Sequence, residues 1–283
     1  MTTQRFERLD LSAPLAEVDG LRFITVRSDA LRRRADISVF VPPGRVIAND
    51  APAALVVLLH GVYGSHWNWA LHGGAHTTLS TLVRAGTVPP FVLAMPSDGL
   101  FGDGSGYVPR LDGDYERWIV DDVPAAVAQA FPELALERVP VCIAGLSMGG
   151  FGALRLGAKY PERFAAISGH SSITNVEALT AFVAEPLPAT LRAAAGTEFD
   201  CGYWLIANRD RLPPVRFDCG DEDPLLAGNR ALHARLVAAG VAHNYAEFPG
   251  GHEWAYWRRH LTDTYRFFAD ALTRTTRPST SSG

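Results

Sequence analysis

Lysine is almost absent from this sequence of 283 residues: among its 26 basic residues only Lys159 is a lysine, which we interpret as codon bias. The 30 acidic residues outnumber the basic ones, so the formal net charge is −4. A chain without a basic excess lacks the charge that attracts nucleic acid or an anionic membrane surface. We therefore expect neither as a partner.

Cysteine and long apolar runs are scarce as well. The three cysteines, Cys142, Cys201 and Cys219, form no C-x-x-C pair, which argues against a disulfide framework or a zinc knuckle. No stretch of about 18 apolar residues occurs, and the N-terminal segment holds no apolar core of the kind that a secretory signal needs. These absences predict a cytoplasmic protein without a membrane anchor.

Strand and helix signals alternate along the interior of the chain. Short apolar runs, typical of strands buried on both faces, occupy Leu55–Leu59, Phe91–Met95, Val141–Ala144, Phe164–Ile167, Val215–Cys219 and Tyr245–Phe248. Helical stretches cover 77–84, 115–130, 148–159, 229–239 and 254–273. This order predicts an α/β fold with a mostly parallel sheet and helices on both faces. The alternating segment Arg34–Val41, paired with Arg22–Arg27, predicts an antiparallel N-terminal edge.

We expect a single domain over residues 1–273, because a chain with 47% hydrophobic residues can bury one large core. Residues 172–213 mix weak helix signals with prolines between two predicted strands. We interpret them as an insertion over the carboxyl end of the sheet, where ligands bind in such folds. The polar tail, residues 274–283, is predicted to be disordered.

One serine stands in a pattern that carries chemistry. Ser147 lies at the centre of a G-x-S-x-G sequence, between the predicted strand Val141–Ala144 and a helix that begins at Met148. The sharp turn strains the serine and leaves no room for bulky neighbours, and the start of the helix favours a developing anion. This context favours a nucleophile over an incidental serine in a glycine-rich turn.

A second turn, HGVYG, follows the predicted strand Leu55–Leu59. In hydrolases with this strand–turn–helix arrangement, an N–H after an early strand and the N–H after the nucleophile together bind the oxyanion. We assign these two donors to the backbone of Val62 and Met148. His60 is expected to hold the loop.

The base should be a histidine that comes after the acid, which in turn comes after Ser147. His252 lies in a loop between the predicted strand Tyr245–Phe248 and the last helix, at the carboxyl edge of the sheet. His243 comes before that strand, at its opposite end. His252 is therefore the predicted base.

The acid should lie on the loop that follows the predicted strand Val215–Cys219, because this loop carries several carboxylates. Asp221 and Asp223 both lie on this loop and could accept the proton of the imidazole Nδ1. Sequence spacing alone does not separate them.

Two clusters invite a metal assignment that we reject. His72 and His76 are four residues apart, but Gly73 and Gly74 between them and the lack of a flanking carboxylate argue against a site. The acidic run 112–116 lacks the glycine and the distal glutamate of a standard calcium loop. We expect no metal.

Four ordered segments, LLHGVYGSHWNW, GLSMGGFGAL, CGDEDPL and GGHEWAYW, resemble the esterase D / tributyrin esterase group of α/β-hydrolases. That group includes feruloyl esterases, S-formylglutathione hydrolases and secreted mycolyltransferases. The likeness runs from about Leu55 to about Phe268. It implies the α/β-hydrolase fold and a serine carboxylesterase that acts on small to medium acyl esters without a cofactor. In the family's C/Q-G-x-x-D turn the acid maps to Asp223, with Asp221 as the fallback.

Three alternatives remain beside the carboxylesterase: a thioesterase of the S-formylglutathione hydrolase type, an acyltransferase, and a non-catalytic binding module. The last is the least expected, because all three triad positions are filled. The possible pocket residues are His60, Gly61, Tyr63, Trp67, Tyr107, Trp204 and Trp254. For the aromatic side chains, packing in the core is an equal alternative.

Overall fold

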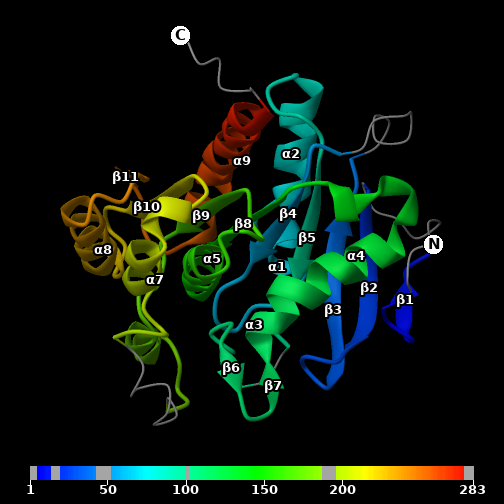
Figure 1. Ribbon diagram of the computed structural model, residues 1–283, viewed down its shortest axis with the longest axis horizontal. Helices are drawn as coiled ribbons and strands as arrows, with labels where there is room; N and C mark the ends of the chain where they lie inside the picture. The colour runs from blue at the N-terminus through cyan, green and yellow to red at the C-terminus, as the bar shows by residue number, and fades with distance from the viewer. Residues whose placement is uncertain (1–4, 14–19, 43–51, 100–101, 187–195, 277–283) are drawn as a thin grey trace.

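The apolar runs of the sequence form the central strands of one sheet (Figure 1). The computed structural model describes residues 5–13, 20–42, 52–99, 102–186 and 196–276. Within these residues the nine-stranded sheet has the order β1-β2-β3-β5-β4-β8-β9-β10-β11. Its strands are β1 (Leu9–Leu11), β2 (Leu21–Ser28), β3 (Arg33–Phe40), β4 (Ala54–Leu59), β5 (Phe91–Pro96), β8 (Val141–Leu146), β9 (Ala166–His170), β10 (Val215–Gly220) and β11 (Asn244–Phe248). A separate ribbon pairs β6 (Pro109–Arg110) with β7 (Gly113–Asp114).

Strand direction follows the hydrophobic pattern. Neighbouring strands from β5 through β4 and β8 to β11 are parallel, whereas β1–β2, β2–β3 and β3–β5 are antiparallel pairs. Every residue of β4 and β5 is buried, as expected for strands that are covered on both faces. The predicted mostly parallel sheet with an antiparallel N-terminal edge is therefore confirmed.

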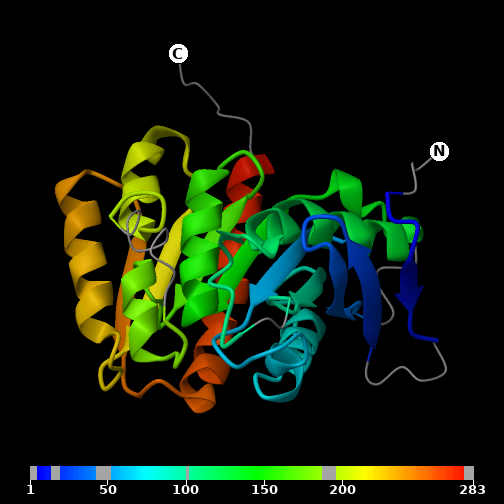
Figure 2. The same cartoon turned by 90° about the horizontal axis from the view of Figure 1, so that it is seen from below.

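Helices cover both faces of the sheet (Figures 1 and 2). They are α1 (Asn68–Leu71), α2 (Ala75–Arg84), α3 (Tyr115–Arg117), α4 (Val123–Ala130), α5 (Met148–Lys159), α7 (Cys201–Ala207), α8 (Leu226–Ala238) and α9 (Trp254–Thr276). Alternate residues of β4 belong to two buried clusters. One cluster packs α4, α5, α7 and α8 against one face of the sheet, and the other packs α1, α2 and α9 against the opposite face. The two-faced cover expected from the sequence is confirmed.

The helix predicted over 115–130 is interrupted by a π-helical turn, η2 (Trp118–Asp122). Pro124 is the cause, because it has no N–H to bond the carbonyl of Val120 four residues earlier. The Arg163 side chain donates to that carbonyl instead, at 2.9 Å. Shorter 3₁₀ turns are η3 (Pro132–Leu134), η4 (Leu136–Arg138), η5 (Val176–Ala181) and η6 (Arg209–Arg211).

Several element boundaries differ from those predicted. The strand β9 begins at Ala166 and reaches His170, later than the predicted 164–167. The last helix continues to Thr276, three residues into the segment predicted to be disordered, and 277–283 lie outside the described residues. No helix in the described part of the chain is both long and apolar enough to cross a membrane.

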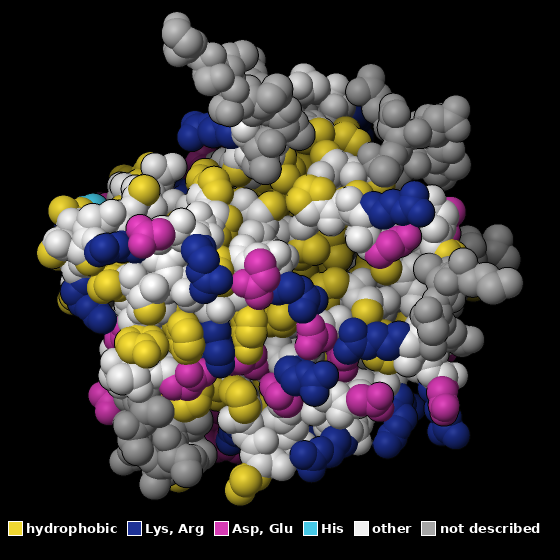
Figure 3. All heavy atoms as spheres, in the orientation of Figure 1, with side chains coloured by type: hydrophobic (Ala, Val, Ile, Leu, Met, Phe, Trp, Pro, Cys, Tyr) yellow, Lys and Arg dark blue, Asp and Glu magenta, His cyan; other side chains and the backbone are white. Residues whose placement is uncertain are grey.

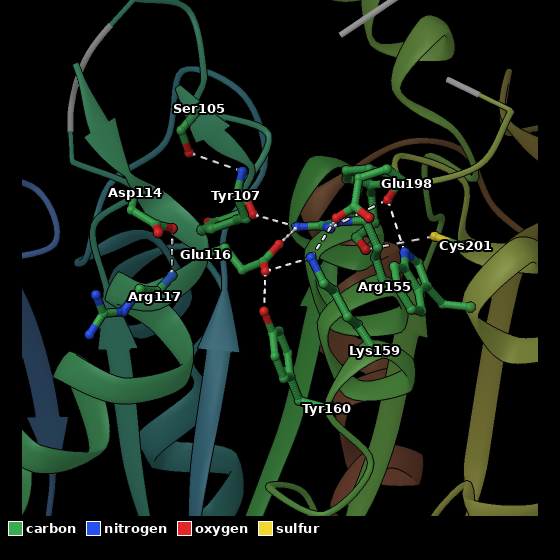
Figure 4. A network of polar contacts seen from close by, with 12 residues as sticks. Ser105, Tyr107, Asp114, Glu116, Arg117, Arg155, Lys159, Tyr160, Glu198 and Cys201 are labelled. Atoms are coloured by element: carbon green, nitrogen blue, oxygen red, sulfur yellow. Dashed lines mark hydrogen bonds and ion pairs between the residues drawn. The ribbon is translucent and has the colours of Figure 1, made fainter. Parts of the chain in front are cut away.

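A network of buried charges holds α5 against its surroundings (Figure 4). Arg155 is fully buried and pairs with Glu116 and Glu198, while its guanidinium also donates to the Tyr107 carbonyl at 3.0 Å. Burial raises the pKa of Glu116, but Arg155 and the other donors around this carboxylate hold its pKa below the usual value. Breaking such a buried pair typically costs about 3–5 kcal/mol. The network thus ties the predicted insertion, through Glu198, to the helix that begins at the nucleophile.

The surface shown in Figure 3 mixes both charge signs. Lysine and arginine side chains lie among aspartate and glutamate side chains on the described part of this face. On the described part of this face, the basic side chains do not gather into a broad positive patch of the kind that nucleic acid requires.

Candidate active site

Ser147 occupies a strained turn between β8 and α5. Its φ of 54° and ψ of −118° lie outside the ordinary regions for an L residue. The two glycines of the motif are needed for close approach. A Cβ on Gly145 would lie 2.1 Å from the Gly149 carbonyl oxygen, and a Cβ on Gly149 would lie 2.1 Å from the Leu59 carbonyl oxygen. The sequence therefore forces the serine into the sharp turn that the motif predicted.

The side chains of Ser147, His252 and Asp223 form one hydrogen-bonded chain. The His252 Nε2 lies 3.0 Å from the Ser147 Oγ, and its Nδ1 lies 2.9 Å and 3.1 Å from the two oxygens of Asp223. His252 comes from the loop between β11 and α9, and Asp223 from the loop after β10. Because these strands are parallel, their carboxyl ends bring the three residues to one edge of the sheet.

Asp223 and Asp221 have different surroundings. Burial raises the pKa of Asp223, but the hydrogen bond and charge of His252, the Leu225 N–H and the Ser171 hydroxyl together hold its pKa below the usual value. Asp221 is exposed and accepts the Gly250 N–H at 3.0 Å, so it pins the neighbouring loop. Of these two aspartates, Asp223 is the one that bonds the imidazole of His252.

A second His–Asp pair lies behind the first. His170 Nδ1 is 2.9 Å from Asp218, whose other partners include Arg216 and Tyr256. Burial raises the pKa of Asp218, but the charges of His170 and Arg216 outweigh this effect and lower that pKa to about 2. The far nitrogen of His170 meets Thr264 at 2.8 Å inside the protein. This pair is fully buried, so it supports the sheet and cannot meet a substrate.

Two backbone N–H groups beside Ser147 remain available. Within the described residues, neither the Val62 N–H nor the Met148 N–H has a protein partner. Met148 is the first residue of α5, whose N-terminus favours negative charge. Gly61 lies against the nucleophile, because a Cβ on it would lie 3.3 Å from the Ser147 Cβ. The two turns that carry the N–H groups therefore meet at the serine.

His60 and Tyr107 lie inside the protein and not in a pocket. The Tyr107 hydroxyl donates to the His60 carbonyl at 3.0 Å, and the His60 Nε2 accepts the Asp98 N–H at 3.0 Å. Tyr107 is fully buried and His60 is 1% exposed. Their prediction as pocket residues is wrong, because both use their polar atoms to hold the loop after β4.

Trp204 also lies away from the nucleophile. Its ring packs 5.3 Å from the Lys159 Nζ, and its Nε1 donates to the Glu198 carbonyl at 3.0 Å. Lys159 ends α5, about 18 Å along the helix axis from Ser147, so Trp204 lies beside the end of that helix that is far from the nucleophile. The prediction of Trp204 as a pocket residue is therefore wrong.

Two further candidates, Trp254 and Trp67, belong to a row of rings that leads outward from the base. The Trp257 ring lies 4.9 Å from His252 and 5.2 Å from Trp254, which in turn lies 5.4 Å from His72. Trp67 is 38% exposed and lies 5.2 Å from His72, at the outer end of the row. Of the three tryptophan rings in this row, Trp257 lies next to the base, and Trp254 and Trp67 follow it in that order.

Two loops approach the oxyanion turn. Tyr63 is 67% exposed, and its N–H donates to the Asp103 carbonyl at 3.0 Å. Asp103 also accepts from the N–H groups of Ala184 and Glu185, at 2.7 Å and 3.0 Å. The start of the predicted insertion is thereby fastened to the turn that carries Val62.

Sequence reasoning missed Phe182, whose ring lies 5.3 Å from the imidazole of His252 at an interplanar angle of 31°. It belongs to the predicted insertion, just after η5. No local pattern marks this phenylalanine, because its place over the base depends on how the insertion folds back. Sequence reasoning also missed Trp257, although this residue lies five positions after His252 in the same motif.

The histidines considered for a metal have separate partners. His66 contacts the Ser38 hydroxyl at 2.8 Å, His72 lies between two tryptophan rings, and His76 packs against Phe40. Over the described ranges, no group of three or more histidine, cysteine, aspartate and glutamate side chains is placed to hold a metal ion.

Comparison with known proteins identifies a family. The model of a family described as putative esterase matches residues 28–268. An acetyl esterase from Caldicellulosiruptor saccharolyticus is 24% identical over 269 residues, which cover 87% of this chain and 97% of the relative. Esterase Rv1288 from Mycobacterium tuberculosis is 28% identical over 218 residues; the match covers 67% of this chain and 46% of that longer protein.

Solved structures share the fold. A ferulic acid esterase superposes with a TM-score of 0.75 at 22% identity, covering 93% of this chain and 99% of the other. The S-formylglutathione hydrolase FrmB from Staphylococcus aureus gives a TM-score of 0.70 at 18% identity, covering 88% and 98%. The resemblance inferred from the four sequence segments is confirmed: the chain belongs to the putative esterase family and is a serine hydrolase with the α/β-hydrolase fold.

Proposed function

We propose that Ser147 is the nucleophile of this carboxylesterase, His252 its base and Asp223 the acid that orients the base. The observation that carries the proposal is the unbroken hydrogen-bonded chain from the serine hydroxyl to the carboxylate. Such a chain removes the serine proton as the hydroxyl attacks, which is the arrangement that nucleophilic catalysis by serine requires. We further propose small to medium acyl esters as substrates.

The reaction has two steps. Ser147 attacks the ester carbonyl while His252 takes its proton, and the N–H groups of Val62 and Met148 bind the oxygen on which negative charge develops. His252 then protonates the departing alcohol, leaving an acyl group on the serine. Water activated by His252 releases the acid and restores the enzyme. Losing one oxyanion donor typically costs about 3 kcal/mol in the barrier.

A thioesterase of the S-formylglutathione hydrolase type and an acyltransferase use the same residues. The fold likeness to FrmB fits the first of these but does not favour it over the carboxylesterase. The cytoplasmic location and the single domain with its insertion stay predictions from the sequence.

We expect the purified protein to hydrolyse p-nitrophenyl esters, with activity for acetate to butyrate and a decline toward decanoate. A parallel assay with S-formylglutathione, and one with an added alcohol as acyl acceptor, measures the two alternatives. Turnover of the thioester without turnover of any oxygen ester would replace the carboxylesterase by the thioesterase. Formation of a new ester in preference to free acid would replace it by the acyltransferase.

Phe182 is expected to limit the size of the alcohol part of the substrate, because it covers the imidazole that protonates the departing alcohol. Phe182→Ala should raise kcat/KM for 2-naphthyl acetate relative to p-nitrophenyl acetate by about fivefold. Tyr203→Ala is the matched control, since Tyr203 is an exposed aromatic residue of the same insertion that packs beside Trp204. An unchanged ratio in Phe182→Ala would show that substrates do not pass this ring.

A further inference from the structure

Ser171 lies between the turn of the nucleophile and the turn of the acid. It follows β9, which pairs with β8 on one side and with β10 on the other. Its N–H donates to the Asp218 carbonyl at 2.7 Å, and the preceding carbonyl, of His170, accepts the Ser147 N–H at 3.0 Å. The Ser171 side chain is fully buried. This residue therefore connects the two strands that present the serine and the aspartate.

The backbone of Ser171 has a φ of 44°, in the left-handed region that glycine adopts most easily. A serine there carries a conformational cost that glycine would not. Since a residue in such a conformation persists only where its surroundings support it, the side chain has to be explained. The hydroxyl is the only polar group that serine adds over glycine.

The hydrogen bonds around the hydroxyl define its direction. Trp257 Nε1 donates to the Ser171 Oγ at 3.1 Å, and an indole N–H cannot accept. The hydroxyl therefore receives one bond from Trp257 and keeps its own hydrogen for another acceptor. The Ser171 hydroxyl also helps to lower the pKa of Asp223, so the acid is a neighbour of this hydroxyl. The other neighbour, the Cys219 thiol, is a much weaker acceptor than a carboxylate.

Trp257 also contacts His252, the base that pairs with Asp223. Its ring stands perpendicular to the imidazole of His252, with 4.9 Å between ring centroids. One side chain thus packs against the base and, through its N–H, bonds the Ser171 hydroxyl between the turns of the nucleophile and the acid.

We propose that Ser171 is a positioning residue for ester hydrolysis: its hydroxyl fixes the ring of Trp257, which holds His252 in the arrangement that activates Ser147. The inference rests on the proposed roles of Ser147, His252 and Asp223. Ser171 touches no reacting atom and acts through Trp257.

Two substitutions at position 171 separate activity from stability. Ser171→Ala and Ser171→Gly both remove the hydroxyl, but only glycine relieves the left-handed backbone. We expect both variants to lose about tenfold in kcat with KM changed by less than twofold, because the hydrogen bond that fixes the Trp257 ring against the base is removed. The glycine variant should nevertheless melt at a higher temperature than the alanine variant. A merely structural role would make activity follow stability.

Ser172→Ala is the matched control. Ser172 is the next residue in the chain and equally buried, but its Oγ has no hydrogen-bond partner among the described residues. Its loss should leave kcat and KM unchanged. Trp257→Phe keeps an aromatic ring against His252 and removes only the donor. It should lower kcat in the wild-type background and have little further effect in Ser171→Gly, because both changes break the same connection.

The rate of labelling of Ser147 by a fluorophosphonate probe gives a second readout that does not depend on the choice of ester. Slow labelling of Ser171→Gly beside fast labelling of the wild type and Ser172→Ala supports the proposal. A Ser171→Gly variant with the kcat and labelling rate of the wild type would overturn the positioning role and leave the proposed function standing. Should the position-171 variants not fold, the same result in Trp257→Phe would overturn the positioning role. A wild type that neither labels nor hydrolyses any ester would overturn the proposed function as well.

Discussion

The Ser147→Ala variant is expected to lose ester hydrolysis by about 10⁵- to 10⁶-fold in kcat while remaining folded. Among the described residues, no other side chain is both placed 3.0 Å from the His252 Nε2 and able to form an acyl intermediate. Such a loss corresponds to about 7–8 kcal/mol in the activation barrier. Hydrolysis of p-nitrophenyl acetate by the two proteins, purified side by side, measures the difference.

The variant should keep its fold because the substitution removes only one oxygen. Alanine has the same backbone preference as serine at a φ of 54°, and the lost hydrogen bond contributes about 1 kcal/mol. Circular dichroism and the melting temperature provide the control. A folded variant with near-normal turnover would exclude Ser147 as the nucleophile.

Asp223→Asn is expected to lower kcat by about 10⁴-fold, because an amide cannot hold the imidazole in the tautomer that accepts the serine proton. The asparagine oxygen can still accept the Leu225 N–H, which bonds Asp223 at 2.8 Å, so the loop should keep its shape. The effect should therefore appear in kcat and not in the melting temperature.

Asp221→Asn is the matched control for this substitution. Asp221 lies on the same loop and accepts the Gly250 N–H with one oxygen, a bond that an asparagine oxygen can also form. Its kcat should stay within about twofold of the wild type, as most exposed polar substitutions have small effects. The reverse order, with Asp221→Asn inactive and Asp223→Asn active, would assign the acid to Asp221.

The fold could be read from the sequence because its determinants are local. Runs such as Leu55–Leu59 are apolar at every position, and a strand of that kind must be covered on both faces. The alternation of polar and apolar residues in Arg34–Val41 is also a local pattern, and it predicted the half-exposed strand of the antiparallel edge. The π-helical turn in the helix predicted over 115–130 was missed, although Pro124 is a local signal for it.

The contents of the pocket could not be read in this way. Tyr107 lies in a turn and Trp204 in the short helix α7, and in both places an aromatic residue fits a pocket or the core equally well. Tyr107 bonds the His60 carbonyl and Trp204 the Glu198 carbonyl, and both residues also contact charged side chains of α5, which comes from a different part of the chain. Phe182 lies beside the base in a segment whose following residues, Ala184 and Glu185, are bonded to Asp103 on another loop.

The sequence by itself determined which apolar runs form strands, the strained glycine-flanked turn at Ser147 and the position of His252 at the end of a strand, because each depends on neighbouring residues and steric limits. Only the tertiary structure decided which carboxylate meets the imidazole, which rings lie against it and which serine bonds the tryptophan beside it. Those contacts join residues from different strands and loops. Their distances depend on the register of the parallel sheet and on the packing of loops at its carboxyl edge, neither of which any short segment specifies.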